Sequence, residues 1–228
     1  MIGIICAMRV ELDAIKEFAK DCKEISVGYF NFIKCSVCGK EIVMCVSGVG
    51  KVFAALCAHT MIMRFSPELI INVGVGGNLT SVLKIGDITV ADGLVQHDMD
   101  TTALGDEPGL ISGINIVKFI CDKSIVDKLC DICEKLGFNY SKGTIATGDR
   151  FVSSKEEKNR IVNTFSAVSC DMEGGAIAQA CYINNVPFAA IRAISDDADN
   201  SSPSDFPEFC KTSAQRSAEL VVCFIKEY

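Results

Sequence analysis

Acidic residues, glycines and isolated large apolar residues recur wherever an apolar run of this sequence ends. The most distinctive ending is SCDMEGGAIAQAC, residues 169–181, in which Asp171 and Glu173 flank a methionine and two glycines follow. Carboxyl groups also follow the apolar runs that end near Glu11 and Asp196. Such groups accept hydrogen bonds from hydroxyl groups, and they exchange protons in general acid–base catalysis. The set favours a neutral, polyhydroxylated ligand with an aromatic part.

Each of these residues also has a purely structural interpretation. Glu11 and Glu173 could each favour a helix N-terminus through the helix dipole. Asp196 could be a turn residue or a helix N-cap. Asp149 and Arg150 are neighbours of opposite charge and could simply pair on the surface. The functional interpretation therefore depends on the set of residues rather than on any one of them.

Two glycine-rich stretches resemble nucleotide-binding motifs without matching them. SGVGK lacks the GxxxxGK[ST] spacing of the phosphate loop, which disfavours a nucleoside triphosphate. GVGGNL does not fit GxGxxG, so a dinucleotide is equally disfavoured.

Composition and charge narrow the class of partner. The 228 residues are 49% hydrophobic and carry a formal net charge of −7, with 22 basic against 29 acidic residues. Nucleic acids and anionic membranes need concentrated positive charge, so a small-molecule partner is favoured over either. The N-terminal residues include no basic leader, and no uninterrupted apolar segment approaches the roughly 18 residues that cross a bilayer. We therefore expect a cytoplasmic protein.

The thirteen cysteines are expected to be free thiols. Many replace small apolar residues inside apolar runs, where free cysteine packs well. Two CxxC pairs, Cys35–Cys38 and Cys130–Cys133, could suggest a zinc site. One pair lies in a strand-like run and the other in a helix-like run, and the chain has two histidines. Neither a zinc site nor a redox motif is predicted from them.

Hydrophobic periodicity predicts alternating strands and helices. Strands are predicted at 2–7, 25–30, 31–38, 41–48, 69–75, 87–95, 143–148, 167–172 and 187–195, and helices at 9–20, 51–65, 122–136, 154–164, 174–183 and 205–226. Gly39-Lys40 is predicted as a turn, and 98–113 as a polar connection.

This order predicts one α/β domain over residues 1–228. Its expected architecture is a three-layer α/β/α sandwich around a central mixed, largely parallel sheet. Ligands of such sheets bind at the carboxyl ends of the strands, where the acidic residues described above are placed.

The chain resembles the 5′-methylthioadenosine/S-adenosylhomocysteine nucleosidases of the purine nucleoside phosphorylase superfamily. The likeness is carried along nearly the whole chain by IGIICAMRVEL, SGVGKVFAA, INVGVGGNL, LKIGDITVAD, QHDMD, GDRF, DMEGGAIAQAC and VPFAAIRAISDDAD. It implies a nucleoside phosphorylase-like fold and hydrolysis of an adenine N-glycosidic bond, as part of methionine salvage. It implies no metal or organic cofactor.

The resemblance assigns acid and base roles to individual residues. Asp196, helped by Ser195, would protonate N7 of adenine or hydrogen-bond to it, and burial would keep its proton at neutral pH. Glu11 would activate the attacking water. Arg192 could hold that water and could also pair with Asp171, which would be a supporting acid.

The resemblance also implies how the nucleoside is held. Glu173 would accept hydrogen bonds from both ribose hydroxyls, and Met172 would pack against the sugar. Phe151 would stack on the purine, and the Val152 backbone would read its Watson–Crick edge. The glycines after Glu173 could allow a close approach of the helix to the ligand or could serve tight helix–sheet packing.

An apolar slot for the 5′ substituent is implied as well. Met8, Val49 and Phe206 would line it, and Leu104 of the partner subunit would complete it, because the family's members form homodimers. The segment 198–207 resembles the family's mobile lid.

Three departures from the family pattern bear on the site. Val75, next to Gly76 in the glycine turn near the water, stands where the family often has a serine, so the water must be held by other groups. Asp171 is one methylene shorter than the usual glutamate. The segment 104–113, LGDEPGLISG, differs from the common FGYEYGQ-like run, so the 5′ pocket could accept a different substituent.

Three alternative functions remain open. A phosphorolytic purine nucleoside phosphorylase would need several arginines at the phosphate, and Glu11 would repel that anion. A non-catalytic nucleoside-binding protein could dispense with Glu11 and Asp196, yet both are present. A futalosine-type nucleosidase would use the same chemistry on a nucleoside with another 5′ substituent.

Overall fold

The computed structural model describes residues 1–199 and 206–228, without the side chains of residues 206 and 207. A single ten-stranded sheet runs through this part of the chain. Its strands are β1 (Ile2–Cys6), β2 (Ala19–Val27), β3 (Phe30–Val37), β4 (Lys40–Val46), β5 (Leu69–Asn78), β6 (Ile88–Gln96), β7 (Lys118–Ile120), β8 (Tyr140–Thr147), β9 (Ala167–Asp171) and β10 (Phe188–Asp196).

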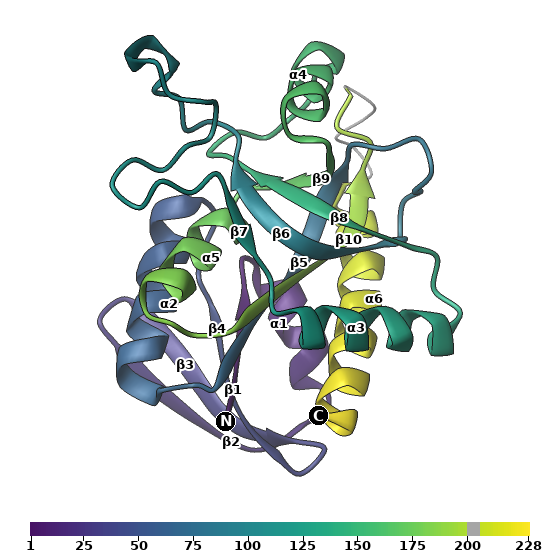
Figure 1. Cartoon of the computed structure of the whole chain (residues 1–228). Helices are drawn as coiled ribbons and strands as arrows, with labels where there is room; N and C mark the ends of the chain where they lie inside the picture. Colours follow the sequence, from purple (N-terminus) through teal and green to yellow (C-terminus); the bar gives the residue numbers. More distant parts are fainter. Residues whose placement is uncertain (200–205) are drawn as a thin grey trace.

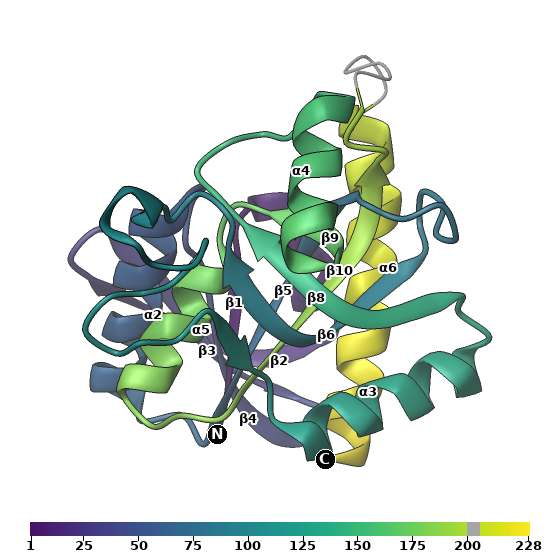
Figure 2. The same ribbon diagram turned by 45° about the horizontal axis from the view of Figure 1, so that its top comes forward.

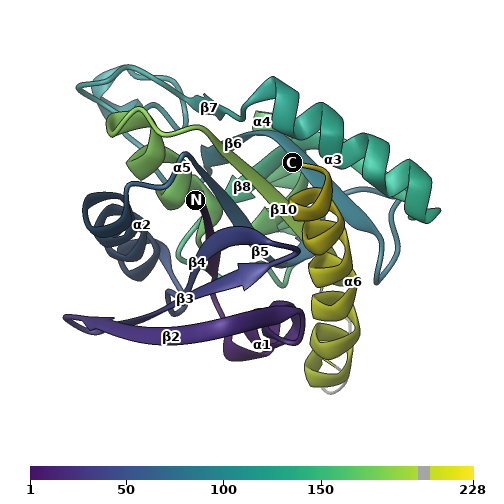
Figure 3. The ribbon, with the colours of Figure 1, turned by 90° about the horizontal axis from the view of Figure 1, so that it is seen from below.

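The sheet is strongly curved and closes on itself over half of its width. Its order is β10-β6-β8-β9-β5-β1-β4-β3-β2, and β5 also pairs with β10. Strands β10, β6, β8, β9 and β5 therefore form a closed ring, while β2, β3 and β4 form an antiparallel meander at the open edge (Figure 3). The mixed sheet confirms the predicted class. It is more antiparallel than predicted, because β6, β7 and β9 each make an antiparallel pairing.

Helices cover both faces of the sheet, as the predicted three layers require. They are α1 (Arg9–Lys16), α2 (Lys51–Phe65), α3 (Lys123–Leu136), α4 (Lys155–Phe165), α5 (Gly174–Ile183) and α6 (Phe206–Glu227). Helices α2 and α5 pack together on one face, and α6 packs with α1 and α3 on the other (Figures 1 and 2). Helix α4 lies against β8 and β9, near the ends of the strands that carry the site.

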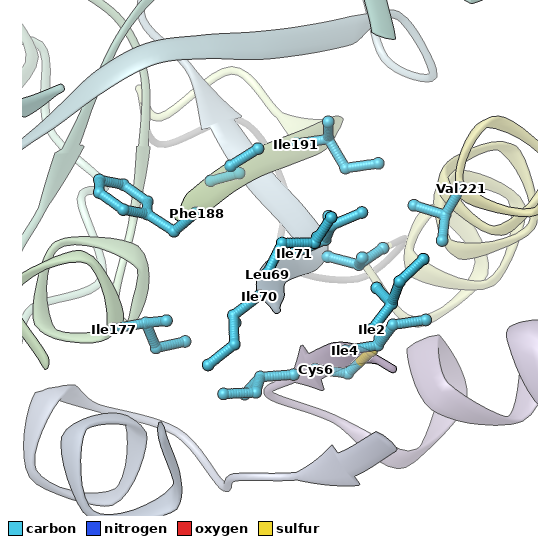
Figure 4. Close-up of a cluster of buried hydrophobic side chains, with 14 of the residues drawn as sticks. Ile2, Ile4, Cys6, Leu69, Ile70, Ile71, Ile177, Phe188, Ile191 and Val221 are labelled. Carbon is cyan, nitrogen blue, oxygen red and sulfur yellow. The ribbon is translucent and has the colours of Figure 1, made fainter. Parts of the chain in front are cut away.

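A continuous apolar core joins the sheet to both helical layers (Figure 4). Ile4, Ile71 and Ile191 come from three strands, Ile177 from α5 and Val221 from α6, and all are essentially inaccessible to solvent. Burial of one such aliphatic side chain contributes about 1.5–3 kcal/mol. These strands are apolar on both sides because helices cover both faces of the sheet.

The first helix and the first hairpin differ from the sequence prediction. Helix α1 ends at Lys16 rather than at residue 20, and the chain from Ala19 onward pairs with β3. The predicted strand 25–30 contains the turn Gly28-Tyr29, since Val27 pairs with Phe30. Gly28 has φ of 59°, a conformation that glycine adopts without strain.

Two smaller predictions are also corrected. The turn between β3 and β4 is Cys38-Gly39, one residue earlier than predicted, and both residues have positive φ as a type I′ hairpin turn requires. Strand β7 was not predicted, because its three residues are too few to show a period.

The cysteines are free thiols, as predicted, and ten of the thirteen are buried. Cys38 of the first CxxC pair is exposed, whereas both cysteines of the second pair lie on the buried side of α3. Across residues 1–199 and 206–228, no cluster of three or more histidine, cysteine or acidic side chains could hold a metal ion. Within the same residues, no helix combines the length and the apolar character of a membrane span.

Candidate active site

A cavity opens at the carboxyl ends of the strands, where the sequence placed the acidic residues. Its walls come from the last residues of β5, β9 and β10 and from the residues that follow β1, β4, β8 and β9. They are Ala7, Met8, Glu11, Val49, Val75, Gly76, Gly77, Arg150, Phe151, Val152, Cys170, Asp171, Met172, Glu173, Ser195 and Asp196. Eleven of the fourteen predicted site residues are thus brought to one cavity from six separate segments.

Glu11 lies in the first turn of α1 and is almost completely buried. Its Oε2 accepts a hydrogen bond from the Met8 N–H at 2.8 Å, and its Oε1 accepts one from the Val75 N–H at 3.0 Å. A Cβ atom on Gly74 would lie 2.9 Å from Glu11 Oε1, so glycine is needed there. Burial raises the pKa of Glu11 although these two N–H groups and Arg192 oppose the rise. Glu11 therefore caps its helix and also faces the cavity.

Glu173 is buried at the start of α5 but makes no side-chain capping hydrogen bond to that helix. Its Oε1 instead accepts a hydrogen bond at 2.9 Å from the N–H of Gly50, which lies 123 residues earlier in the chain. Burial, reinforced by the negative charge of Asp171, raises the pKa of Glu173 to about 7. The carboxyl group is thus held by the residues that follow β4, and its pKa lies near neutral pH.

Asp171, which lines the cavity, forms a buried ion pair with Arg192, which does not. Asp171 also accepts hydrogen bonds from the Thr147 hydroxyl and from the Gly174 N–H, the latter at 3.0 Å. Arg192 also donates to the Asn72 side chain. The Arg192 guanidinium opposes the rise in the pKa of both Glu11 and Glu173, so the pair is electrostatically linked to both carboxyl groups.

Asp196 is the last residue of β10, is half-buried and lines the same cavity. The Ser195 hydroxyl donates to its Oδ2 at 2.9 Å, and the Ala198 N–H donates to its Oδ1 at 3.0 Å. Burial raises the pKa of Asp196 even though both hydrogen bonds favour the charged form. The second bond is of the kind found in turns, so the structural interpretation of Asp196 also holds in part.

Three apolar side chains complete the cavity between these acids. Phe151 follows β8 and is 53% exposed, whereas Val152 beside it is buried. Met172 lies between Asp171 and Glu173 in the sequence and lines the same cavity. An aromatic ring that presents a face to the cavity can stack on a planar ligand.

Of the remaining three predicted residues, Arg192 and Leu104 do not line the cavity, and the side chain of Phe206 lies outside the described residues. Arg192 is 1% exposed and reaches the site through Asp171. Leu104 ends a short 3-10 helix (Thr102–Leu104) and is 83% exposed. Phe206 begins α6, and its side chain lies outside the described structure, as does most of the predicted lid segment 198–207.

The structure adds residues that the sequence analysis did not single out. Asn72 and Thr147 hold Arg192 and Asp171, and Cys170 and Ala7 line the cavity. For Asn72 the sequence did hold a signal, because it is a polar residue within the apolar run of β5. A buried amide needs a hydrogen-bond partner, which here is Arg192.

Asp149 and Arg150 do not pair with each other. Arg150 lines the cavity and forms an ion pair with Glu157 of α4 at 3.4 Å. Asp149 accepts a hydrogen bond from the Lys51 N–H at 2.7 Å. The surface-pair interpretation of these two residues is therefore wrong.

Comparisons with known proteins identify the family of this chain. The model of the phosphorylase superfamily matches residues 1–226. A 5′-methylthioadenosine/S-adenosylhomocysteine nucleosidase of Haemophilus influenzae (strain PittEE) is 37% identical over 222 residues, which cover 97% of this chain and 96% of the relative.

Solved structures give the same result. The Helicobacter pylori MTAN mutant with 5′-methylthioadenosine in its active site superposes with a TM-score of 0.96 at 36% identity, covering 100% of this chain and 98% of that one. A futalosine hydrolase of Helicobacter pylori strain 26695 gives the same TM-score and identity over 100% and 97% of the two chains. The chain belongs to the phosphorylase superfamily and, within it, to the 5′-methylthioadenosine/S-adenosylhomocysteine nucleosidases.

Proposed function

We propose that this chain hydrolyses the N-glycosidic bond of 5′-methylthioadenosine and S-adenosylhomocysteine, with 5′-deoxyadenosine as a further candidate substrate. The products are adenine and the 5-substituted ribose. The observation that supports this most is the convergence of Glu11, Glu173 and Asp196 on one cavity that also contains an aromatic ring. The relatives' names supply the substrate class.

The reaction needs an acid for the leaving base, a base for water and a clamp on the sugar. Asp196 gives its proton to N7 of adenine as the bond between C1′ and N9 breaks. Glu11 takes a proton from the water whose oxygen forms the new bond to C1′. The raised pKa values of both groups support these roles, because an acid must keep its proton and a base must be able to accept one near neutral pH.

The nucleoside is held by groups at both ends of the cavity. Glu173 accepts hydrogen bonds from the two ribose hydroxyls, and Met172 packs on the sugar. Phe151 stacks on adenine while the Val152 backbone contacts the edge of the base. Both hydroxyls and the base are thereby fixed relative to the bond that breaks.

Phosphorolysis is disfavoured because the nearby arginines are engaged by carboxylates. Arg9 is paired with Asp13 at 3.5 Å, Arg150 with Glu157, and Arg192 with Asp171. A phosphate dianion near the cavity would also face Glu11. Mere binding is disfavoured because a nucleoside-binding protein needs neither the acid nor the base.

Futalosine hydrolysis is the second candidate, favoured by the likeness to the futalosine hydrolase. It uses the same acid, base and ribose clamp. Futalosine carries another 5′ substituent, which the atypical segment 104–113 would meet.

We also propose a homodimer in which Leu104 of the partner subunit completes the 5′ slot beside Met8 and Val49. Exposed apolar residues on α2 and α5 support this: they are Val52, Phe53, Leu56, Met63, Tyr182 and Ile183. The segment that carries Leu104 projects on the same side of the molecule as these helices (Figures 1 and 2). Light scattering on the purified protein tests this, and a monomer with full activity would refute it.

The thirteen free thiols favour a reducing compartment, so we place the protein in the cytoplasm.

The deciding experiment is adenine release from 5′-methylthioadenosine in phosphate-free buffer, with wild type beside Asp196→Asn. Rapid release that the substitution abolishes supports hydrolysis and the proposed acid. Release that appears on addition of phosphate would overturn hydrolysis. Release of the purine base from futalosine, measured separately, with no adenine from 5′-methylthioadenosine would favour the second candidate.

A further inference from the structure

Three loops that follow different strands are tied together beside the cavity. The Lys51 N–H donates to Asp149 Oδ1 at 2.7 Å, and the Asp149 N–H donates to Asp98 Oδ2 at 2.8 Å. The Lys51 ammonium also forms an ion pair with Asp98 Oδ1 at 2.6 Å, so each of the three residues contacts the other two. We call Lys51, Asp98 and Asp149 the loop clamp. The side chains of Lys51 and Asp98 are 19% and 28% exposed, so water screens their contact less than that of a surface pair.

The loop clamp is joined directly to Glu173 through the backbone. The Gly50 N–H, one residue before Lys51, donates to Glu173 Oε1, while the next peptide N–H along the chain donates to Asp149. Gly50 has φ of 99°, and a Cβ atom there would lie 3.1 Å from Asp149 Oδ1. Two consecutive N–H groups thus point to two different carboxylates, in a conformation that glycine alone adopts without strain.

Electrostatics keep the loop clamp intact at neutral pH. Burial alone would raise the pKa of Asp98, but the hydrogen bonds from the Lys51 ammonium and the Asp149 N–H outweigh it and hold the pKa below its usual value. Asp98 therefore stays charged opposite Lys51, and the hydrogen bonds between the charged groups are strong ones.

We propose that Lys51, Asp98 and Asp149 are positioning residues for the ribose-binding carboxylate: they fix the Gly50 N–H, which sets the direction of Glu173. This inference rests on the proposed function, because it assigns Glu173 to the ribose hydroxyls. If Gly50 shifts, Glu173 moves away from the two ribose hydroxyls and its hydrogen bonds to them weaken. A substrate that lacks one of these hydroxyls makes fewer such bonds, so its cleavage should suffer less.

Asp98→Asn tests the proposal, since it keeps the size of the side chain but removes the charge that Lys51 meets. Adenine release is measured for 5′-methylthioadenosine and for its 3′-deoxy analogue, under single-turnover conditions so that slow cleavage is still quantified. We expect kcat/KM to fall about tenfold for the ribonucleoside and less than threefold for the analogue. Lys51→Met should give the same selective loss.

The ratio of the two rates within one variant does not depend on how much of the protein is folded. Asp127→Asn is the matched control, because Asp127 is an exposed residue of α3 that contacts two lysines and lies away from the cavity. It should leave both rates and their ratio unchanged. Equal losses on the two substrates in Asp98→Asn, or no loss on either, would overturn the positioning role. Absence of adenine release by the wild type would instead defeat the proposed function.

Discussion

The residues that the proposed function assigns to the ribose and those that it assigns to the base differ in how firmly their polar groups are held. We call these two sets the ribose end and the base end of the cavity. At the ribose end, Glu11 and Glu173 are buried, and each carboxyl group accepts at least one backbone N–H from a distant part of the chain. At the base end, Asp196 is half-buried, its two hydrogen bonds come from within two residues, and Phe151 is 53% exposed. Under the proposed function, the groups that would hold the ribose are thus already fixed by the fold, whereas those that would hold the base are more exposed.

This difference follows from the chemistry proposed for each end. A base and a ribose clamp must be aligned with C1′ to within a fraction of an ångström, and long-range hydrogen bonds provide that rigidity. A planar base can be bound by stacking, which tolerates small displacements. Substitutions at the two ends should therefore affect kcat and KM differently.

The largest effect is expected for Glu11→Gln at the ribose end. Without the base, kcat for adenine release should fall about 10³-fold, within the range usual for general acid–base groups. The amide N–H₂ group of the variant also faces the N–H of Met8 or of Val75, and two donors in contact destabilise the fold. The melting temperature should therefore be recorded in parallel. A loss below tenfold in a folded variant would show that another group activates the water.

Glu173→Gln should lower kcat/KM about 10²-fold, because a neutral amide is a poorer acceptor for two hydroxyls. The same change should stabilise the unliganded protein at pH 8. The folded-state pKa of Glu173 is about 7 against 4.5 for the unperturbed group. Folding therefore favours the protonated form, and stability is lost as pH rises from about 4.5 through 7.

The expected gain for Glu173→Gln at pH 8 is on the order of 3 kcal/mol, and it should vanish near pH 4. Denaturant unfolding at the two pH values measures it. Equal stability of variant and wild type at pH 8 would show that the ribose end is not strained by its own charge.

The sequence predicted the carboxylates of the cavity and the pair between Asp171 and Arg192, which is confirmed, but not the longer-range hydrogen bonds around them. Glu11, Glu173 and Asp196 each follow an apolar run, and strands that share a sheet edge bring such residues together. The hydrogen bonds from Gly50 to Glu173 and from Arg192 to Asn72 each span more than a hundred residues. They depend on the order of the strands, which local patterns do not contain.

The same limit explains the errors in the fold. Residues 17–20 fit a helical pattern, yet pairing with β3 draws Ala19 into a strand. The closed ring of the sheet requires β5 to pair with both β9 and β10. The hydrophobic periodicity of a strand does not indicate which other strands it pairs with. Helix α2, which is regular and long, was predicted at its observed bounds.

Phe151→Leu should separate the base end from the ribose end. Loss of stacking should raise KM for 5′-methylthioadenosine about tenfold and change kcat less than threefold, since acid and base are untouched. Steady-state rates of adenine release measure both constants. An equal fall in kcat would mean that the ring acts in the transition state as well.

Val75→Ser is expected to have the smallest effect, and it is the one change that should increase activity. The Val75 N–H already holds Glu11 at 3.0 Å, and its side chain lines the cavity near the proposed water. A serine hydroxyl there adds a hydrogen bond worth about 1 kcal/mol, so kcat should rise about fivefold. Val75→Ala is the matched control, because it removes the methyl groups without supplying a hydroxyl. If alanine and serine raise kcat equally, the space available to the water limits the rate. If neither raises kcat, the N–H groups of Met8 and Val75 and the carboxyl group of Glu11 already hold the ribose end in its working geometry.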